Sequence, residues 1–161
     1  MLKKGLCLVL VSLLLGGCGV EETVETVADE WVEVLAPVRE IRVSLPEEVA
    51  PVAEDTAGAL YIASDYEICI QTMDGGDLDA TVRSISGHAR EDLTVIATEP
   101  QGLRRYDLVW TAAGEGGDRL GRAVILDDGT HHYTMTVLRD AESAETDQIV
   151  WRTVFESFTL V

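Results

Sequence analysis

The first regular pattern in the second quarter of the chain is an alternation of hydrophobic and polar positions, which is typical of a half-buried β-strand. Residues 39–45 place Ile41, Val43 and Leu45 on one face, and a proline ends the stretch. Residues 47–58 contain a second proline and four acids. We therefore expect them to form a loop.

Two short hydrophobic runs, residues 59–62 and 66–71, flank a turn sequence at residues 63–65. This arrangement predicts a β-hairpin. The residues expected to pair on its core side are Leu60, Ile62, Ile68 and Ile70.

Residues 78–86 change to a helical period, with hydrophobic residues at i, i+4 and i+7. Asp77 precedes them as a helix N-cap, and Gly87 follows where a left-handed C-terminal cap belongs. The pattern predicts a short helix laid on a sheet. A strand over residues 93–98 follows it.

From residue 103 the pattern predicts an antiparallel meander with strands at residues 103–113, 120–126 and 132–138. A glycine-rich turn at 114–118 separates the first two strands. The turn at residues 127–129 separates the last two, and its glycine supplies the positive φ that such hairpins need.

The end of the chain returns to a helical period after an acidic loop at residues 140–145, and its acids lie near the positive end of the helix. We expect the final residues, Leu160 and Val161, to dock against the sheet. The hydrophobic stripe of this C-terminal helix is predicted to contain Ile149, Val150, Val154, Phe155 and Phe158.

These elements add up to a single α+β domain over residues 37–161, with an antiparallel sheet and a middle and a C-terminal helix packed on it. No internal repeat at a fixed period is visible in the sequence.

The first 17 residues have the layout of a secretory signal: Lys3 and Lys4, a hydrophobic run and then small residues. The hydrophobic run is shorter than the roughly 20 residues that a membrane-spanning helix needs. Its ending, Leu15-Gly16-Gly17-Cys18, resembles the lipobox of bacterial lipoproteins. The resemblance implies that Cys18 receives a lipid and becomes the mature N-terminus.

The lipobox gives the chain three parts: a signal peptide at 1–17, a lipidated N-terminus with an acidic tether at 18–36, and the domain. We expect the protein at the cell membrane, anchored by lipid on its extracytoplasmic face. Cys7 leaves with the signal and Cys18 carries lipid, so Cys69 has no cysteine partner within the domain. The domain must then be stabilised by its core, without a disulfide.

The chain is strongly acidic, with 29 acids against 12 basic residues and a formal net charge of −17. Such a charge disfavours binding to nucleic acid. Lys3 and Lys4 are the only lysines, which excludes lysine nucleophiles and lysine-containing phosphate loops from the domain. No cofactor-binding motif is recognisable.

His131 and His132 suggest a metal site, but neighbouring residues of a strand point to opposite faces, so we expect surface or edge histidines. Asp74, Asp77 and Asp79 lack the ligand spacing of a calcium loop, and helix capping explains Asp77. We predict no metal site.

Arg104 and Arg105 form the one basic doublet of the acidic domain. They are the candidate ligand-binding residues, either by contacting an anionic ligand or by neutralising nearby acids. Cys69 lies between two isoleucines and is expected to be a partly buried thiol rather than a nucleophile. The three tryptophans, Trp31, Trp110 and Trp151, are expected to pack in the core or at its edge.

The C-terminal half resembles the end of PsbP-like and DcrB-like envelope domains. The residues that carry the resemblance are Arg122-Ala123-Val124-Ile125-Leu126, Asp128-Gly129, His132-Tyr133-Thr134-Met135-Thr136-Val137 and the segment from Trp151 to Ser157-Phe158. The resemblance implies an α/β/α sandwich in an accessory protein that acts by binding. It brings no catalytic residue with it.

We therefore interpret the chain as a lipid-anchored, non-catalytic binding or accessory module at the membrane surface, with no cofactor and an unknown protein or small ligand as its partner. The alternative is an enzyme, or an enzyme subunit, with a site built from dispersed acidic residues. Clustered carboxylates in a sizeable pocket would favour the enzyme. A shallow surface with a hydrophobic patch would favour the binding module.

Overall fold

The computed structural model describes residues 38–46, 49–114, 117–141 and 148–161. The predicted signal peptide, the lipidation site Cys18, Trp31 and the acidic tether lie outside the described residues. Within these ranges no helix has the length and hydrophobicity needed to cross a membrane.

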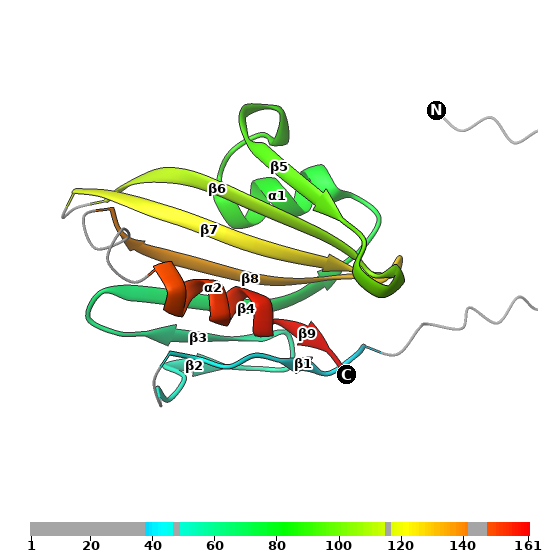
Figure 1. Ribbon diagram of the computed structural model, residues 1–161, viewed down its shortest axis with the longest axis horizontal. Coiled ribbons are helices and arrows are strands. Elements are labelled where there is room, and N and C mark those ends of the chain that lie inside the picture. Colours follow the sequence, from blue (N-terminus) through cyan, green and yellow to red (C-terminus); the bar gives the residue numbers. More distant parts are fainter. Residues whose placement is uncertain (1–37, 47–48, 115–116, 142–147) are drawn as a thin grey trace, which may run out of the picture. The chain divides into compact units, whose positions relative to one another are not determined.

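Seven antiparallel strands form the main sheet, in the order β2-β3-β4-β8-β7-β6-β5 (Figure 1). Strands β6, β7 and β8, which follow one another in the sequence, are also neighbours in the sheet and form the predicted meander. Strand β4 lies beside β8. The strands are β2 (Ala53–Glu54), β3 (Gly58–Ile62), β4 (Tyr66–Asp74), β5 (Thr94–Thr98), β6 (Arg104–Gly114), β7 (Gly117–Asp127) and β8 (His131–Asp140).

Two helices and a small second sheet complete the domain. The helices are α1 (Leu78–Ser86) and α2 (Gln148–Ser157), and two 3₁₀ turns, η1 (Arg90–Asp92) and η2 (Pro100–Gly102), flank β5. The small sheet pairs β1 (Ile41–Arg42) with β9 (Thr159–Leu160). It ties the start of the domain to the end of the chain, where Val161 N donates to Glu40 O at 2.9 Å.

The two helices cover opposite faces of the sheet (Figure 1), so the sheet has a core on each side. On one side Trp151, Val154 and Phe155 of α2 pack on β4, β7 and β8. On the other side Val82 of α1 packs on Leu108 and its neighbours in β6 and β7. This is the predicted α+β fold.

The ends of α1 follow the sequence signals. Asp77 accepts a hydrogen bond from Ala80 N at 2.9 Å, which satisfies an otherwise unpaired N–H of the first turn. Gly87 adopts a φ of 76° as the C-terminal cap and donates its N–H to Arg83 O. Both predicted caps are confirmed.

The predicted hairpin is present, but its register is different from the expected one. Ala63 N donates to Tyr66 O, so the turn contains only Ser64 and Asp65. Leu60 therefore lies opposite Cys69, and Ile62 lies opposite Glu67 and is exposed. A shift by one residue moves every side chain of a strand to the other face. The expected core positions of Leu60 and Ile62 were wrong.

The N-terminal strand is shorter than predicted, with two paired residues instead of seven. Its hydrophobic face is as expected, because Ile41, Val43 and Leu45 all pack against the α2 core. The predicted loop at 47–58 contains the short edge strand β2, which pairs with β3.

The predicted stripe of α2 is partly wrong. Ile149 and Val150 are exposed, whereas Trp151 is buried together with Val154 and Phe155. Phe158, just beyond the helix, is buried as predicted. Leu160 is docked as expected, but the side chain of Val161 is exposed.

Val154 and Val150 form a matched pair on α2 for measuring what the helix contributes to stability. Val154 is 2% exposed in the core, and Val150 is 45% exposed. We expect Val154→Ala to lower the free energy of unfolding by about 2 kcal/mol, through lost burial and a residual cavity. Val150→Ala should change it by less than about 0.5 kcal/mol. Urea denaturation of both variants measures the difference, and equal losses would contradict the assigned buried face.

Candidate functional site

A groove runs along one side of α2, where the helix leaves the face of β6 and the part of β7 around Arg122 uncovered. It consists of two hollows that share Arg122, one of about 270 Å³ and one of about 680 Å³. We call the smaller hollow the arginine pocket. Its lining residues are Val109, Leu120, Arg122, Val137, Arg139, Gln148, Trp151, Arg152 and Phe155.

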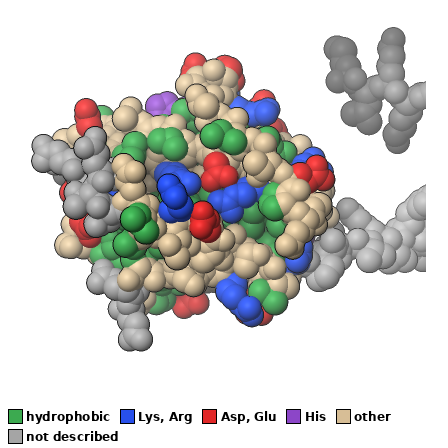
Figure 2. All heavy atoms as spheres, viewed as in Figure 1, with side chains coloured by type: hydrophobic (Ala, Val, Ile, Leu, Met, Phe, Trp, Pro, Cys, Tyr) green, Lys and Arg blue, Asp and Glu red, His purple; other side chains and the backbone are tan. Residues whose placement is uncertain are grey.

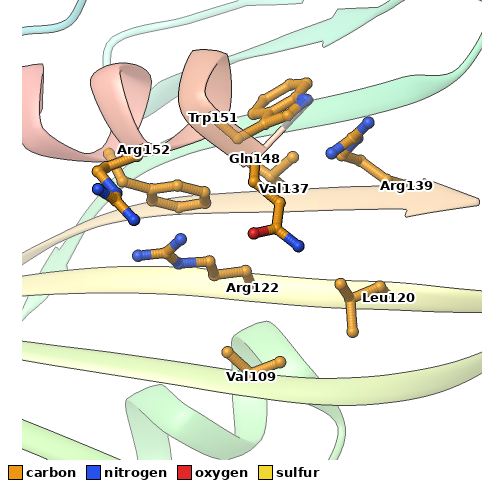
Figure 3. A pocket seen from close by; sticks show the side chains of 9 residues that line it. Val109, Leu120, Arg122, Val137, Arg139, Gln148, Trp151 and Arg152 are labelled. Atoms are coloured by element: carbon orange, nitrogen blue, oxygen red, sulfur yellow. The ribbon is translucent and has the colours of Figure 1, made fainter. Parts of the chain in front are cut away.

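Three guanidinium groups surround the arginine pocket (Figure 3). Arg122 and Arg152 lie on one side of it and Arg139 on the other, with the amide of Gln148 between them. Arg122 comes from β7, Arg139 from β8 and Arg152 from α2. The three guanidinium groups therefore come from three elements, and Val109 of β6 adds a fourth element to the lining.

Arg122 is held in place by an aromatic ring and a carboxylate. Its guanidinium carbon lies 4.0 Å from the centre of the Phe155 ring, a cation–π contact. Its Nη2 atom lies 3.7 Å from Asp107 Oδ1. Asp107 in turn accepts two hydrogen bonds from Arg105, at 2.8 and 3.2 Å. Arg122 therefore shares its carboxylate with a closer partner.

Arg139 is 5% exposed, and its guanidinium lies against an aromatic ring of α2. Its guanidinium carbon is 4.8 Å from the centre of the Trp151 ring. Trp151 also meets Tyr66 edge to face, with ring centres 5.1 Å apart. The buried aromatic pair thus provides a fixed surface on which Arg139 rests.

Arg152 is exposed on α2 at the rim of the pocket. It forms no ion pair with any residue that the structure describes. Its charge therefore faces the pocket and solvent, with no carboxylate of the described residues paired to it.

Figure 2 shows basic and acidic side chains together in the middle of this face, with hydrophobic side chains around them. The acids that line the groove, Asp107 and Glu156, belong to the larger hollow. Among the residues that the structure describes, the lining of the arginine pocket contains no acid, cysteine, serine or histidine. It can bind and orient an anion, and it offers no nucleophile or general acid–base group of these types.

The predicted arginine doublet is split between the two faces of β6, as alternation along a strand requires. Arg104 is exposed, and its Nη1 atom lies 3.4 Å from Asp127 Oδ2. Arg105 lines the larger hollow and donates to Phe155 O at 3.0 Å in addition to its bonds with Asp107. Both arginines thus neutralise acids, and Arg105 alone reaches the groove.

Sequence reasoning missed Arg122, Arg139 and Arg152. The signal was present for the first two, because each continues the row of inward-facing hydrophobic residues on its strand. A charge in such a row marks a place where a sheet face meets solvent or a ligand. Arg152 carries no comparable signal, since exposed arginines on helices are common.

His131 and His132 do point in different directions, but His132 is not a surface residue. It is 1% exposed, and its Nδ1 atom lies 2.6 Å from Thr81 Oγ1 of α1, so it joins the helix to β8. Burial lowers the pKa of His132, although Asp127 and Asp128 act in the opposite direction. Nothing in the sequence indicates that α1 covers this position.

The turn before β8 is organised around Asp128. Its carboxylate accepts hydrogen bonds from His131 N at 2.7 Å, Thr130 N at 2.9 Å and the Tyr133 hydroxyl at 2.9 Å. Burial raises the pKa of Asp128, but these hydrogen bonds outweigh it and hold the pKa below its usual value. The carboxylate is thereby occupied in maintaining the turn.

The remaining candidates have structural roles. Asp77 caps α1, and Asp79 pairs with Arg90 at 3.2 Å. Cys69 is half-buried, and burial raises the pKa of its thiol, which makes it less nucleophilic. Across the part of the chain that the structure describes, no three His, Cys, Asp or Glu side chains are placed to hold a metal ion.

Comparison with known proteins finds similarity in fold alone. No protein-family model matches the chain, and no curated protein sequence matches it. The solution structure of the cyanobacterial PsbP of Synechocystis is 15% identical with a TM-score of 0.50, covering 70% of this chain and 79% of that one. The crystal structure of LpqN, described as involved in cell envelope biogenesis of Mycobacterium tuberculosis, is 14% identical with a TM-score of 0.50, covering 77% and 84%.

The lowered pKa of His132 makes stability depend on pH. The folded state favours the neutral form of His132. The stability that this preference contributes is present above the unfolded pKa of about 6.5 and is lost as pH falls below that value. We expect the free energy of unfolding to decrease with pH in this range, and His132→Gln to flatten the decrease. Urea denaturation between pH 7 and pH 5 measures both proteins, and an unchanged slope in the variant would assign the effect to other groups.

Proposed function

We propose that this protein is a non-catalytic binding module of the bacterial cell envelope, anchored by lipid on Cys18, whose groove beside α2 receives the ligand or partner. The anchor rests on the lipobox sequence, and the binding role rests on the groove.

The observation that carries the proposal is the chemistry of the arginine pocket. Three arginines, two aromatic rings and three aliphatic side chains surround it, with one glutamine as the remaining polar group. Ligand sites have this composition: a mostly hydrophobic concave surface with a few polar groups that fix orientation. Within the described residues, the pocket lining has no group that could attack or deprotonate a substrate, because its arginines stay protonated and only donate hydrogen bonds.

The alternative of an enzyme built from dispersed acids receives no comparable support. The groove acid Asp107 is engaged by Arg105 and Arg122. Cys69, Asp128, His132 and Tyr133, whose pKa values are shifted by their surroundings, all lie outside the groove. Of the two discriminating features named from the sequence, clustered carboxylates in a sizeable pocket and a shallow surface with a hydrophobic patch, the first is absent from the described lining of the arginine pocket.

The envelope location agrees with one of the structures of similar fold, since LpqN is described as involved in cell envelope biogenesis. The role in cell envelope biogenesis is described for LpqN and not for this chain. For this chain the likeness supports a fold used at the cell envelope, and the signal sequence supplies the independent argument for export.

The anchor is tested by Cys18→Ser. Without its acceptor sulfur the protein cannot carry the lipid, and the lipid's buried methylenes, worth about 0.8 kcal/mol each, no longer hold it on the membrane. We expect the variant to move from the membrane to the soluble envelope fraction, while Cys69→Ser stays with the membrane. Fractionation and immunoblotting measure the distribution, and retention of the Cys18 variant would refute lipid anchoring.

The groove is tested by photo-crosslinking in cells. Val109 lines the arginine pocket and is 49% exposed, so benzoylphenylalanine at this position can reach an occupant. Ile62 is similarly exposed on the other face of the sheet and serves as the control position. We expect an adduct, identified by mass spectrometry, at 109 and none at 62. Absence of any adduct at position 109 would refute the groove as the binding site.

A further inference from the structure

We propose that the arginine pocket binds an anionic amphiphile, a molecule with a carboxylate or phosphate group at one end and a hydrophobic chain behind it. This inference rests on the proposed function and names the chemical class of its ligand.

The acid group is recognised by the arginines. Guanidinium groups present planar N–H donors that match the oxygens of carboxylate and phosphate. Arg122 and Arg152 face the pocket from one side, and Arg139 closes it on the other (Figure 3). An acid group placed between them would lie among donors from three elements, with the amide of Gln148 as a further donor.

The charge balance around the pocket favours an anion. The whole chain has a formal net charge of −17, and its ten arginines are the only basic residues after Lys4. Three of these ten line one small hollow, and the described residues of its lining include no carboxylate. The guanidinium groups of Arg122 and Arg152 lie on the same side of this hollow (Figure 3), and a bound anion would offset the repulsion between them.

The contact with Phe155 holds the guanidinium of Arg122 in a position from which it can bind an acid group. The guanidinium carbon of Arg122 lies over the ring of Phe155. The N–H groups of the guanidinium point outward in its own plane. The contact of Arg122 with Asp107 is 3.7 Å long, beyond hydrogen-bond distance, so those N–H groups retain capacity for a closer acceptor. Arg152 has no carboxylate partner among the described residues, so no ion pair that the structure describes has to be displaced before it binds.

The hydrophobic part of the ligand is recognised by the rest of the lining. Trp151, Phe155 and Leu120 surround the space next to the arginines. Its volume of about 270 Å³ is at the small end of ligand sites, so it holds an acid group and only the first part of a chain. The exposed side chains of Val109 and Ile96 continue the hydrophobic surface toward the larger hollow. A chain can follow this path, which an inorganic anion would leave empty.

The experiment uses the full chain in nanodiscs of phosphatidylcholine, with empty nanodiscs as background. Calorimetric titration compares four probes: hexyl phosphate, hexanoate, inorganic phosphate and hexanol. We expect hexyl phosphate and hexanoate to bind at least about tenfold more tightly than inorganic phosphate or hexanol, because only they satisfy both parts of the site. Equal binding of inorganic phosphate, or of hexanol, would overturn the inference.

Two variants locate the binding. Arg152→Gln removes an exposed arginine that forms no ion pair with a described residue, so the fold should be retained, and Arg122→Gln removes the arginine that lies over the Phe155 ring. Each should weaken hexyl phosphate binding about tenfold, the effect of losing one hydrogen bond to a charged group. The matched control is Arg83→Gln, an exposed arginine on α1, which should bind as the parent does. Unchanged binding in Arg152→Gln and Arg122→Gln would place the probes elsewhere and overturn the inference.

The same titration distinguishes the source of the ligand. If the natural amphiphile is a bilayer lipid, replacing phosphatidylcholine by phosphatidylglycerol in the nanodiscs should compete with hexyl phosphate. If it is a soluble monomer, hexyl phosphate should bind equally in both. Either result requires the anionic amphiphile site. A photo-adduct at position 109 without binding of any anionic probe would retain the binding module and reject this ligand class, whereas failure of both would reject the two together.

Discussion

The fold depends on the burial of β8 from both sides. Every residue from His132 to Val137 is buried, with Tyr133, Met135 and Val137 facing α2 and His132, Thr134 and Thr136 facing away. A strand of this kind is stable only when both faces of the sheet are covered. The two helices lie on opposite faces for that reason, and Thr81 of α1 satisfies the polar ring of His132 that would otherwise be buried without a partner.

The groove follows from how little of a sheet one helix can cover. A helix is roughly 10 Å wide and strands lie about 4.8 Å apart, so a single helix covers about two strands. On its face of the sheet, α2 lies over β4 and β8 (Figure 1), and the β1–β9 pair packs beside it against the same core. The face of β5 and β6, with the part of β7 around Arg122, is left open on the other side of α2. Arg105, Arg122 and the half-exposed Val109 lie there because none of the described elements fully covers that part of the sheet.

The sequence was informative wherever structure is set by neighbouring residues. The caps of α1, the turn at Gly129 and the alternation in β6 depend on a few adjacent side chains, and each was predicted. The errors arose where tertiary contacts decide. The register of the β3–β4 hairpin depends on one residue in its turn. The predicted buried face of α2 was placed too close to Ile149, because the contact between the rings of Trp151 and Tyr66 exists only in the folded domain. The arginine pocket combines β7, β8 and α2, which no local pattern connects.

The positions of Arg122 and Arg139 are better explained by binding than by folding. Both continue rows of hydrophobic residues, Leu120 to Leu126 in β7 and Tyr133 to Val137 in β8, and both lie against aromatic rings of α2. A hydrophobic side chain at either position would extend the core, and replacing a buried charge such as that of Arg139 in this way is often neutral or stabilising. The fold therefore gains little from a guanidinium in these rows. A site that must hold an anion against the field of a chain with a net charge of −17 gains a great deal, because Coulomb attraction at close range outweighs the screened repulsion of distant acids.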